Sequence, residues 1–210
     1  MSGPGARRVV PSSLESSFGL EAPGIPIGDR PDGRPLRLPL LADEQVRVAV
    51  LDLPELLRLM ALRLLGAGCE LTVVTADPRS WAGVQRAGGN PPVLVTPGLT
   101  RWPLEGSVAP RALVVDMPEP PRPEFARHRW TTVVHGATRA SLRSPWWLGA
   151  QVLLARPGSG RTVAALSPST DAASVREIDL LSPPDFAAVV RGRLHVARWA
   201  PTARETAALG

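Results

Sequence analysis

The sequence predicts an α/β fold, with a single domain whose mixed, partly parallel sheet is built on a βαβ unit and extended by hairpins. The main observation is a strand–helix–strand pattern. Residues 46–51 and 71–75 are almost continuously apolar, and residues 54–66 between them carry leucines at helical spacing. Strands that are apolar on both faces are typical of a buried parallel sheet. The pattern therefore indicates a parallel pair joined by a right-handed crossover.

Turn signals and shorter apolar segments place the remaining elements. The Pro-Asp-Gly turn at residues 31–33 predicts a hairpin over residues 25–41. We expect a short helix over residues 78–87 and a helix running through residues 186–190 after Ser182 as its N-cap. The expected strands are residues 92–96, 112–115, 131–135 and 194–199, with a second hairpin formed by residues 151–155 and 162–166.

The predicted domain organisation is an arm, one domain and a tail. Residues 1–23 are rich in Ser, Gly and Pro and are expected to be a disordered or loosely docked arm. Residues 24–202 form the α/β domain, and residues 203–210 are a tail.

The composition indicates which partners and which cell compartment to expect. The net charge is +5, and all the basic residues are arginines, dispersed along the chain among acidic residues rather than clustered. Nucleic-acid binding requires a basic face, so no nucleic acid is expected as a partner. The single cysteine, Cys69, suits a reducing compartment. No segment approaches the ~20 apolar residues that span a bilayer. We expect a cytoplasmic protein that associates with a membrane only through a partner.

Residues 156–162, Arg-Pro-Gly-Ser-Gly-Arg-Thr, invite comparison with a phosphate-binding loop. Such a loop needs Gly-x-x-x-x-Gly-Lys-Ser/Thr at the start of a helix. Here Ala155 occupies the position of the first Gly and Arg161 that of the Lys, and the following residues 163–166 have a strand-like composition. A hairpin turn is therefore the preferred interpretation.

Two acidic residues follow apolar strands, Asp52 after residues 46–51 and Asp116 after residues 112–115. Asp116 resembles the Mg²⁺-binding acid of a nucleotide site, yet Asp also commonly turns the chain after a buried strand. His128, His135 and His195 do not have metal-ligand spacing, and Cys69 is expected to be a buried thiol. We therefore predict no catalytic residues, no metal site and no cofactor.

Trp146 and Trp147 are the candidate partner-binding residues. They lie between Pro145 and Gly149 on an expected loop, and Trp is enriched at interaction hot spots. The alternative is that both indoles fill the core.

Part of the chain resembles the cytoplasmic portion of EccE, a component of the actinobacterial type VII (ESX) secretion system. The resemblance covers residues 25–85 and rests on short motifs. They are Asp-Gly-Arg-Pro at residues 32–35, Arg-Leu-Leu-Gly-Ala at 63–67, Leu-Thr-Val-Val-Thr at 71–75 and Ala-Asp-Pro-Arg-Ser-Trp at 76–81. The sequence departs from the pattern at Asp77, at the additional Gly68, and in lacking the family's N-terminal membrane helices.

This resemblance implies a structural subunit that is not an enzyme. It would be a scaffold or accessory subunit in protein transport, acting through protein–protein interaction with other subunits of a secretion complex. Two alternatives remain open. One is a degenerate nucleotide-binding enzyme that uses Asp52 or Asp116, and the other is an Arg-rich nucleic-acid binder.

Overall fold

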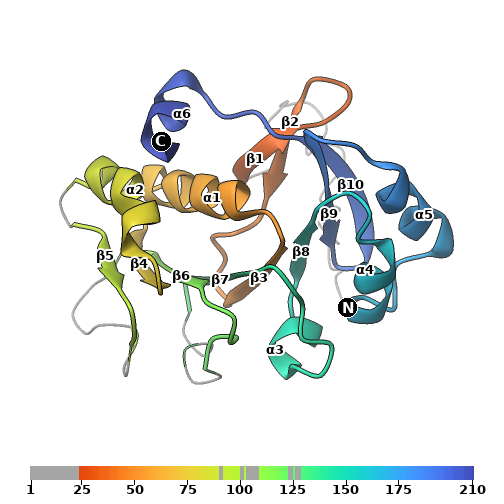
Figure 1. Ribbon diagram of the computed structural model, residues 1–210, viewed down its shortest axis with the longest axis horizontal. Coiled ribbons are helices and arrows are strands. Elements are labelled where there is room, and N and C mark those ends of the chain that lie inside the picture. The colour runs from red at the N-terminus through yellow and green to blue at the C-terminus, as the bar shows by residue number, and fades with distance from the viewer. Residues whose placement is uncertain (1–23, 90–91, 100–101, 103–108, 123–124, 126–128) are drawn as a thin grey trace, which may run out of the picture.

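The fold is described from a computed structural model, which covers residues 24–89, 92–99, 102, 109–122, 125 and 129–210. These residues form a single ten-stranded sheet with helices on both faces (Figure 1). The strands are β1 (Ile25–Asp29), β2 (Pro35–Leu38), β3 (Val46–Leu51), β4 (Glu70–Thr75), β5 (Leu94–Thr96), β6 (Arg111–Asp116), β7 (Thr131–Ala137), β8 (Val152–Ala155), β9 (Asp185–Val190) and β10 (Arg193–Arg198). The helices are α1 (Pro54–Gly66), the 3₁₀ turn η1 (Pro78–Trp81), α2 (Ala82–Ala87), α3 (Pro145–Leu148), α4 (Gly160–Leu166), α5 (Ala172–Leu180) and α6 (Ala203–Leu209).

The strand order is β2-β1-β10-β9-β8-β3-β7-β6-β4-β5. Strands β8 to β5 in this order are all parallel, and the four strands on the other side pair in antiparallel fashion. The predicted fold class, a mixed and partly parallel sheet, is therefore confirmed. The predicted βαβ unit differs in one respect, because β7 and β6 lie between β3 and β4.

The two faces of the sheet are buried in two separate hydrophobic clusters. One face packs against α1 and α2 and includes Val48, Val50 and Met60, and the other packs against α3, α4 and α5 and includes Ala49 and Leu51. Close packing of α1 on the sheet requires a glycine at position 136, because a Cβ there would lie 2.3 Å from Leu57 Cδ2. The architecture is thus three layers, with β3 buried on both sides.

Two predicted elements have the wrong type. Residues 162–166 belong to helix α4 rather than a strand, because the chain turns away from the sheet after β8 and buries Val163 and Leu166 on one helical face. Residues 185–190 form strand β9 rather than a helix. They hydrogen-bond to β8 on one side and β10 on the other, and this tertiary pairing outweighs the local helix-start signal.

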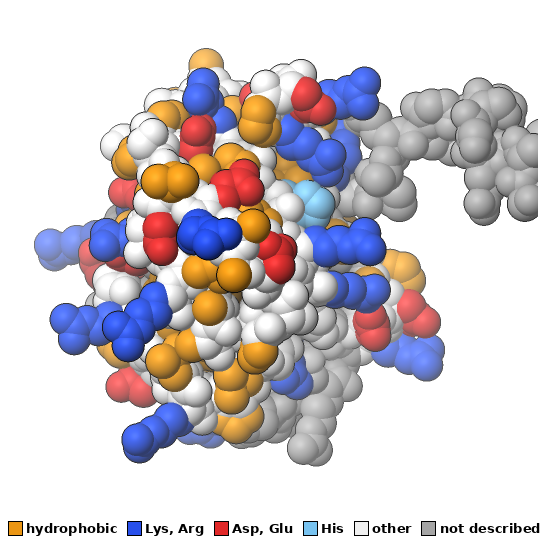
Figure 2. Space-filling model, turned by 90° about the vertical axis from the view of Figure 1, so that its right-hand side faces the viewer, with side chains coloured by type: hydrophobic (Ala, Val, Ile, Leu, Met, Phe, Trp, Pro, Cys, Tyr) orange, Lys and Arg blue, Asp and Glu red, His pale blue; other side chains and the backbone are white. Residues whose placement is uncertain are grey.

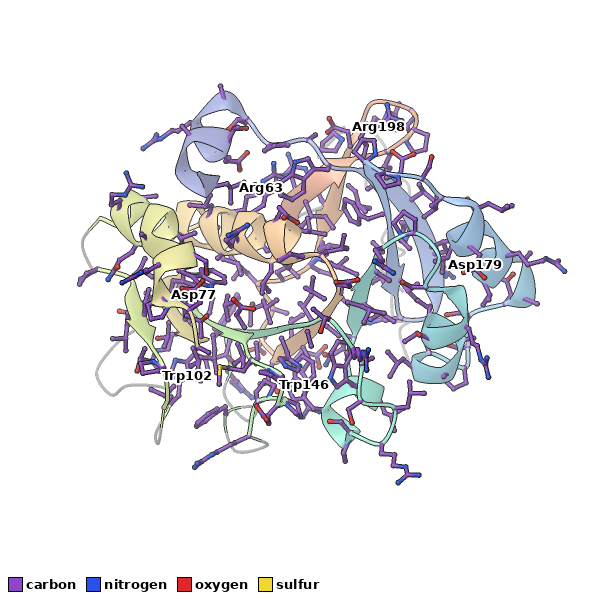
Figure 3. The ribbon with its side chains drawn as sticks, in the orientation of Figure 1. Arg63, Asp77, Trp102, Trp146, Asp179 and Arg198 are labelled. Atoms are coloured by element: carbon purple, nitrogen blue, oxygen red, sulfur yellow. The ribbon has the colours of Figure 1, made fainter. Side chains whose placement is uncertain are left out.

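The C-terminal helix α6, which lies within the segment expected to be a tail, is attached to the domain by an ion pair with low exposure. Arg63 on α1 donates to Glu205 Oε1 at 2.8 Å through Nε and to Glu205 Oε2 at 3.1 Å through Nη2. It also donates to the carbonyls of Pro26 and Ala200. Figure 3 shows Arg63 on the side of α1 that faces α6. One guanidinium therefore joins α1, β1, the segment after β10 and α6.

The first prediction concerns this guanidinium. The Arg63 and Glu205 side chains are only 11% and 18% exposed, so Arg63→Met leaves a poorly solvated carboxylate without its partner. We expect the free energy of unfolding to fall by about 3 kcal/mol, in the range for breaking a buried pair. Urea unfolding followed by tryptophan fluorescence measures this change.

The matched control is Arg198→Met. Arg198 pairs with Asp185 at 2.9 Å but is 64% exposed, and water screens such a surface pair, so its loss should change stability much less. Equal losses from the two variants would contradict the special role given to Arg63.

Candidate functional site

The carboxyl ends of the parallel strands meet at one edge of the sheet, where the chain leaves β3 and β7 toward opposite faces. The connection after β3 forms α1 in one layer, and the connection from β7 to β8 carries α3 in the other layer. Ligands of open α/β sheets bind outside the carboxyl ends of the strands at such a switch point. The ends of β3, β7 and β8 are thus the first place to look for a site.

A pocket of about 520 Å³ opens at this edge, beside the ends of β3 and β8. Cavities of about 300–1,000 Å³ are typical of small-molecule sites. Its walls come from four separate segments of the chain. The lining residues are Asp52, Leu53, Glu55, Leu56, Arg156, Pro157, Pro183, Pro184, Asp185, Phe186 and Trp199. We call this cavity the β3–β8 pocket.

Asp52 and Arg156 form an ion pair in the wall of the β3–β8 pocket. Arg156 Nη1 lies 2.8 Å from Asp52 Oδ2, and 59% of the arginine side chain is exposed. Asp52 has a φ of 54°, in the left-handed region, and its N–H donates to the carbonyl of Ala137 at the end of β7. The turn after β3 thereby directs the Asp52 carboxylate toward β8.

Helix α1 begins in the wall of the same pocket. No side chain caps its first turn, because Leu53 occupies the N-cap and Pro54 follows. The N–H groups at a helix start carry a partial positive charge and favour an anion. Two further carboxylates, Glu55 and Asp185, also line the pocket, although Asp185 is bonded to Arg198. The pocket therefore holds positive and negative groups side by side.

Asp116 lies outside this pocket. It ends β6, which is separated from β3 by β7, and its Oδ2 accepts hydrogen bonds from Trp81 Nε1 at 2.9 Å and Thr75 Oγ1 at 3.3 Å. The structure thus separates Asp52 from Asp116, the two acids that the sequence singled out, by two strand spacings, roughly 10 Å. Through the first of these hydrogen bonds, Asp116 holds the indole of Trp81 at the carboxyl end of β6.

The glycine-rich segment at residues 156–162 does open a helix, so the prediction of a strand over residues 163–166 is no argument against a phosphate loop. The departures from the loop pattern at Ala155 and Arg161 remain, and the structure adds a further argument. Asp179 Oδ1 accepts the N–H of Gly160 at 2.8 Å, and the N–H of Gly158 donates to the carbonyl of Ile178. A Cβ at Gly160 would also meet Val175 O at 2.4 Å. Helix α5, on which Figure 3 labels Asp179, therefore binds the N–H groups that a phosphate would need and fills the space beside them.

Trp146 and Trp147 lie in helix α3 rather than on a loop, and both are buried, with 5% and 2% exposure. Their rings contact His135 edge-on, with centroids 5.2 and 5.3 Å from its own. In the chain alone the two indoles belong to the core. Their contact with a partner stays a prediction, and it would require α3 to move.

The remaining candidate residues do not converge. Among the described residues no three His, Cys, Asp or Glu side chains are grouped as metal ligands. Burial raises the pKa of the Cys69 thiol to about 11, so it stays protonated at neutral pH. Burial and the nearby Arg30 and Arg193 lower the pKa of His195. His128 lies outside the described residues.

Comparison with known proteins adds a likeness of fold. No protein-family model matches the sequence, and no curated protein matches it. Among solved structures, the DNA-packaging ATPase B204 of Sulfolobus turreted icosahedral virus matches with a TM-score of 0.52 and 10% identity, covering 76% of this chain and 99% of that chain. The genome-packaging NTPase B204 of Sulfolobus turreted icosahedral virus 2, solved with AMPPCP, matches with a TM-score of 0.47 and 11% identity, covering 74% and 98%.

The first of these matches corrects the resemblance drawn from residues 25–85. The chain has the fold of a packaging ATPase, so its identification as an EccE-like secretion component is wrong. Three expectations rested on that identification or accompanied it: a scaffold without enzymatic activity, secretion-complex partners, and no nucleic acid. They are overturned by the same finding, because the matched protein is a DNA-packaging ATPase. In the part of the chain that the structure describes, no helix is long and apolar enough to cross a membrane.

Some residues of the β3–β8 pocket can be predicted from the sequence, and others cannot. Asp52 attracted attention as an acid after a strand, and Arg156 as part of a glycine-rich segment. Phe186 and Trp199 do not stand out in the sequence, because only the strand order places β9 beside β8 and β10 beside β9. An aromatic residue close to the start or the end of a strand, as Phe186 is in β9 and Trp199 is after β10, is the signal that could identify them.

The second prediction concerns His135, which is fully buried. Its Nε2 lies 2.9 Å from the carbonyl of Met117, and its Nδ1 has no hydrogen-bond partner among the described residues. Burial lowers the pKa of His135, outweighing the hydrogen bond and the nearby carboxylates of Asp116 and Glu119. The unfolded chain therefore binds more protons near pH 6, so stability is greatest above about pH 6.5 and decreases as pH falls.

Urea unfolding at several pH values between 7.5 and 5.5 measures this dependence. We expect His135→Phe to flatten the slope relative to the unchanged chain. The control is His195→Phe, which should flatten it less because His195 is only half-buried. A slope unaffected by His135→Phe would show that another group titrates.

Proposed function

We propose that this chain is a nucleotide-binding enzyme domain that takes a Mg²⁺–nucleoside phosphate in the β3–β8 pocket. The observation that carries the proposal is the position of Arg156 beside the uncapped start of α1, in a pocket at the switch point of the sheet. A guanidinium and helix N–H groups are the two protein groups that most often hold phosphate oxygens. The likeness of fold to a packaging ATPase agrees with this ligand class.

The carboxylates in the pocket suit a phosphate ligand only when a cation accompanies it. Mg²⁺ prefers oxygen ligands, and it is commonly held by one or two carboxylates together with substrate phosphates and water. Asp52, in the turn just before α1, supplies one such carboxylate. When bound, Mg²⁺ would neutralise phosphate charge and stabilise a leaving phosphate.

The apolar part of the pocket suits the nucleoside. Phe186 and Trp199 line it together with Leu53, Leu56 and the two prolines at 183 and 184. Aromatic side chains bind the flat face of a base by stacking. Glu55, whose side chain is 62% exposed, is the acid left to orient a water molecule toward the phosphate. Asp52, paired with Arg156, would place that guanidinium beside the cation that it holds.

The pocket departs from the usual phosphate-binding pattern because no glycine-rich loop or lysine is present at the β3–α1 turn. A bound phosphate would receive fewer backbone N–H groups than in a phosphate loop. We therefore expect affinity in the micromolar range or weaker and slow turnover.

The third prediction tests the pocket through Arg156. Removal of a charge-assisted hydrogen bond makes the binding free energy less favourable by about 1.5–3 kcal/mol, which corresponds to a roughly 10- to 100-fold lower affinity. We expect Arg156→Ala to weaken Mg-ATP binding by that factor in isothermal titration calorimetry. Chelation of Mg²⁺ should weaken binding to the unchanged chain.

The control is Arg161→Ala, because Arg161 lies on α4 and outside the pocket lining. A release assay for inorganic phosphate then separates binding from chemistry. Glu55→Gln should keep most of the binding and lose hydrolysis. Equal Mg-ATP affinity in the Arg156→Ala and Arg161→Ala variants would contradict the proposed site.

A further inference from the structure

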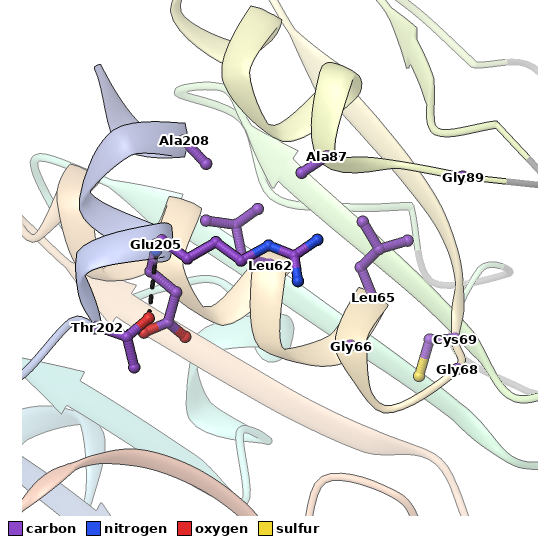
Figure 4. Close-up of a pocket in the computed structure, with 11 residues that line it drawn as sticks. Leu62, Leu65, Gly66, Gly68, Cys69, Ala87, Gly89, Thr202, Glu205 and Ala208 are labelled. Carbon is purple, nitrogen blue, oxygen red and sulfur yellow. Dashed lines mark hydrogen bonds between the residues drawn. The ribbon is translucent and has the colours of Figure 1, made fainter.

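A second cavity lies at the other end of α1. It has a volume of about 530 Å³ and is lined by Leu62, Leu65, Gly66, Gly68, Cys69, Ala87, Gly89, Thr202, Arg204, Glu205 and Ala208. Figure 4 shows it between the last turns of α1, the end of α2 and helix α6. We call it the α1–α6 pocket. Helix α1 has 13 residues, so the two cavities are roughly 20 Å apart and are separate sites.

The α1–α6 pocket lies between two fixed contacts of helix α6. On one side α6 packs closely on α2, where a Cβ at Gly83 would lie 1.7 Å from Ala208 O. On the other side Glu205 is held by Arg63. Because both contacts are specific, the space between the helices is maintained rather than left to collapse.

Missing side chains keep the cavity open. At Gly66, Gly68 and Gly89, all in its lining, an added Cβ would have no neighbour within 4 Å. Most of the remaining lining is apolar, from Leu62, Leu65, Ala87 and Ala208, and the protonated thiol of Cys69 adds no charge. The pocket therefore favours the apolar part of a ligand.

The lining also carries one uncompensated charge. Burial alone would raise the pKa of Glu205, but the hydrogen bonds from Arg63 and Thr202 outweigh it and hold that pKa below its usual value. The carboxylate is thus charged and neutralised by Arg63. Arg204, also in the lining, is exposed and makes no ion pair with any residue that the structure describes. The free charge at the pocket is therefore positive.

The carbonyls at the end of α1 do not oppose an anion strongly. The N–H groups of Ala67, Gly68 and Cys69 already donate to the carbonyls of residues 63–65. At the start of α6 the N–H groups of Thr202 and Glu205 are already used in a capping box, so they are not donors for a ligand. Apolar walls and a free guanidinium are a combination that suits an amphipathic anion.

We propose that the α1–α6 pocket binds an amphipathic anion, a carboxylate that carries an extended apolar chain. The apolar chain of the ligand lies over Gly66 and Gly68 between Leu62 and Leu65, and the ligand's carboxylate pairs with Arg204. This proposal does not depend on nucleotide binding at the β3–β8 pocket.

Decanoate, below the concentration at which it forms micelles, is the probe, and calorimetry with the full chain is the measurement. Decylamine and decanol are the comparison ligands. We expect decanoate to bind at least tenfold more tightly than decylamine. Arg204→Gln should reduce decanoate affinity about tenfold and leave decanol affinity unchanged. Arg86→Gln, on α2 but outside the lining, is its control.

Gly66→Leu tests whether the apolar chain of the ligand lies beside Gly66. Gly66 is the last residue of α1 and does not need a positive φ, so leucine fits the backbone and fills the cavity. We expect it to abolish decanoate binding without lowering the unfolding temperature. Gly98→Leu, at another open glycine outside the pocket, should leave binding intact. Decanoate binding that survives Gly66→Leu, equal binding of decylamine, or no decanoate binding by the unchanged chain would each overturn the proposal.

Discussion

The structure depends on one constraint, which is that β3 must be paired along both edges and covered on both faces. Its residues 46–51 hydrogen-bond to β7 on one side and β8 on the other, and residues 48–51 are at most 5% exposed. Residues 48–51 are accordingly all apolar, and the groups that can act on a ligand follow at the carboxyl end of the strand. That end is where Asp52 turns the chain toward α1 and meets Arg156. The position of the candidate site follows from the burial of the strand before it.

Some charged residues of the domain hold its elements together, and others lie on its surface. Arg63 and Glu205 are used to attach α6, and Asp179 and Asp116 to fix a loop and an indole. On the face shown in Figure 2, arginines and acidic side chains are interspersed, without a continuous basic surface. The β3–β8 pocket differs because it combines an exposed guanidinium, carboxylates and aromatic residues in one cavity. This combination is the reason to place a charged small molecule there.

The sequence predicts those elements whose structure depends on their own residues. Residues 46–51, 54–66 and the Pro-Asp-Gly hairpin belong to this group, because burial period and turn chemistry are local. Residues 162–166 and 185–190 were assigned the wrong type, because their structure depends on α5 and on strands β8 and β10. The pocket could be predicted only in part for the same reason. Its residues at 52–56, 156–157, 183–186 and 199 meet through the strand order, which local patterns do not determine. The short motifs of residues 25–85 are local patterns too, and they do not predict the likeness of fold to a packaging ATPase.

The most direct test of the central claim is the map of backbone amide chemical shifts when Mg-ADP is added to the ¹⁵N-labelled chain. We expect the largest changes at Asp52, Glu55 and Leu56, at the start of α1, and at Arg156. The Gly160 amide, held by Asp179, should change little. Changes centred on Gly158 and Gly160, or an unchanged spectrum at millimolar Mg-ADP, would contradict the assignment of the β3–β8 pocket as the nucleotide site.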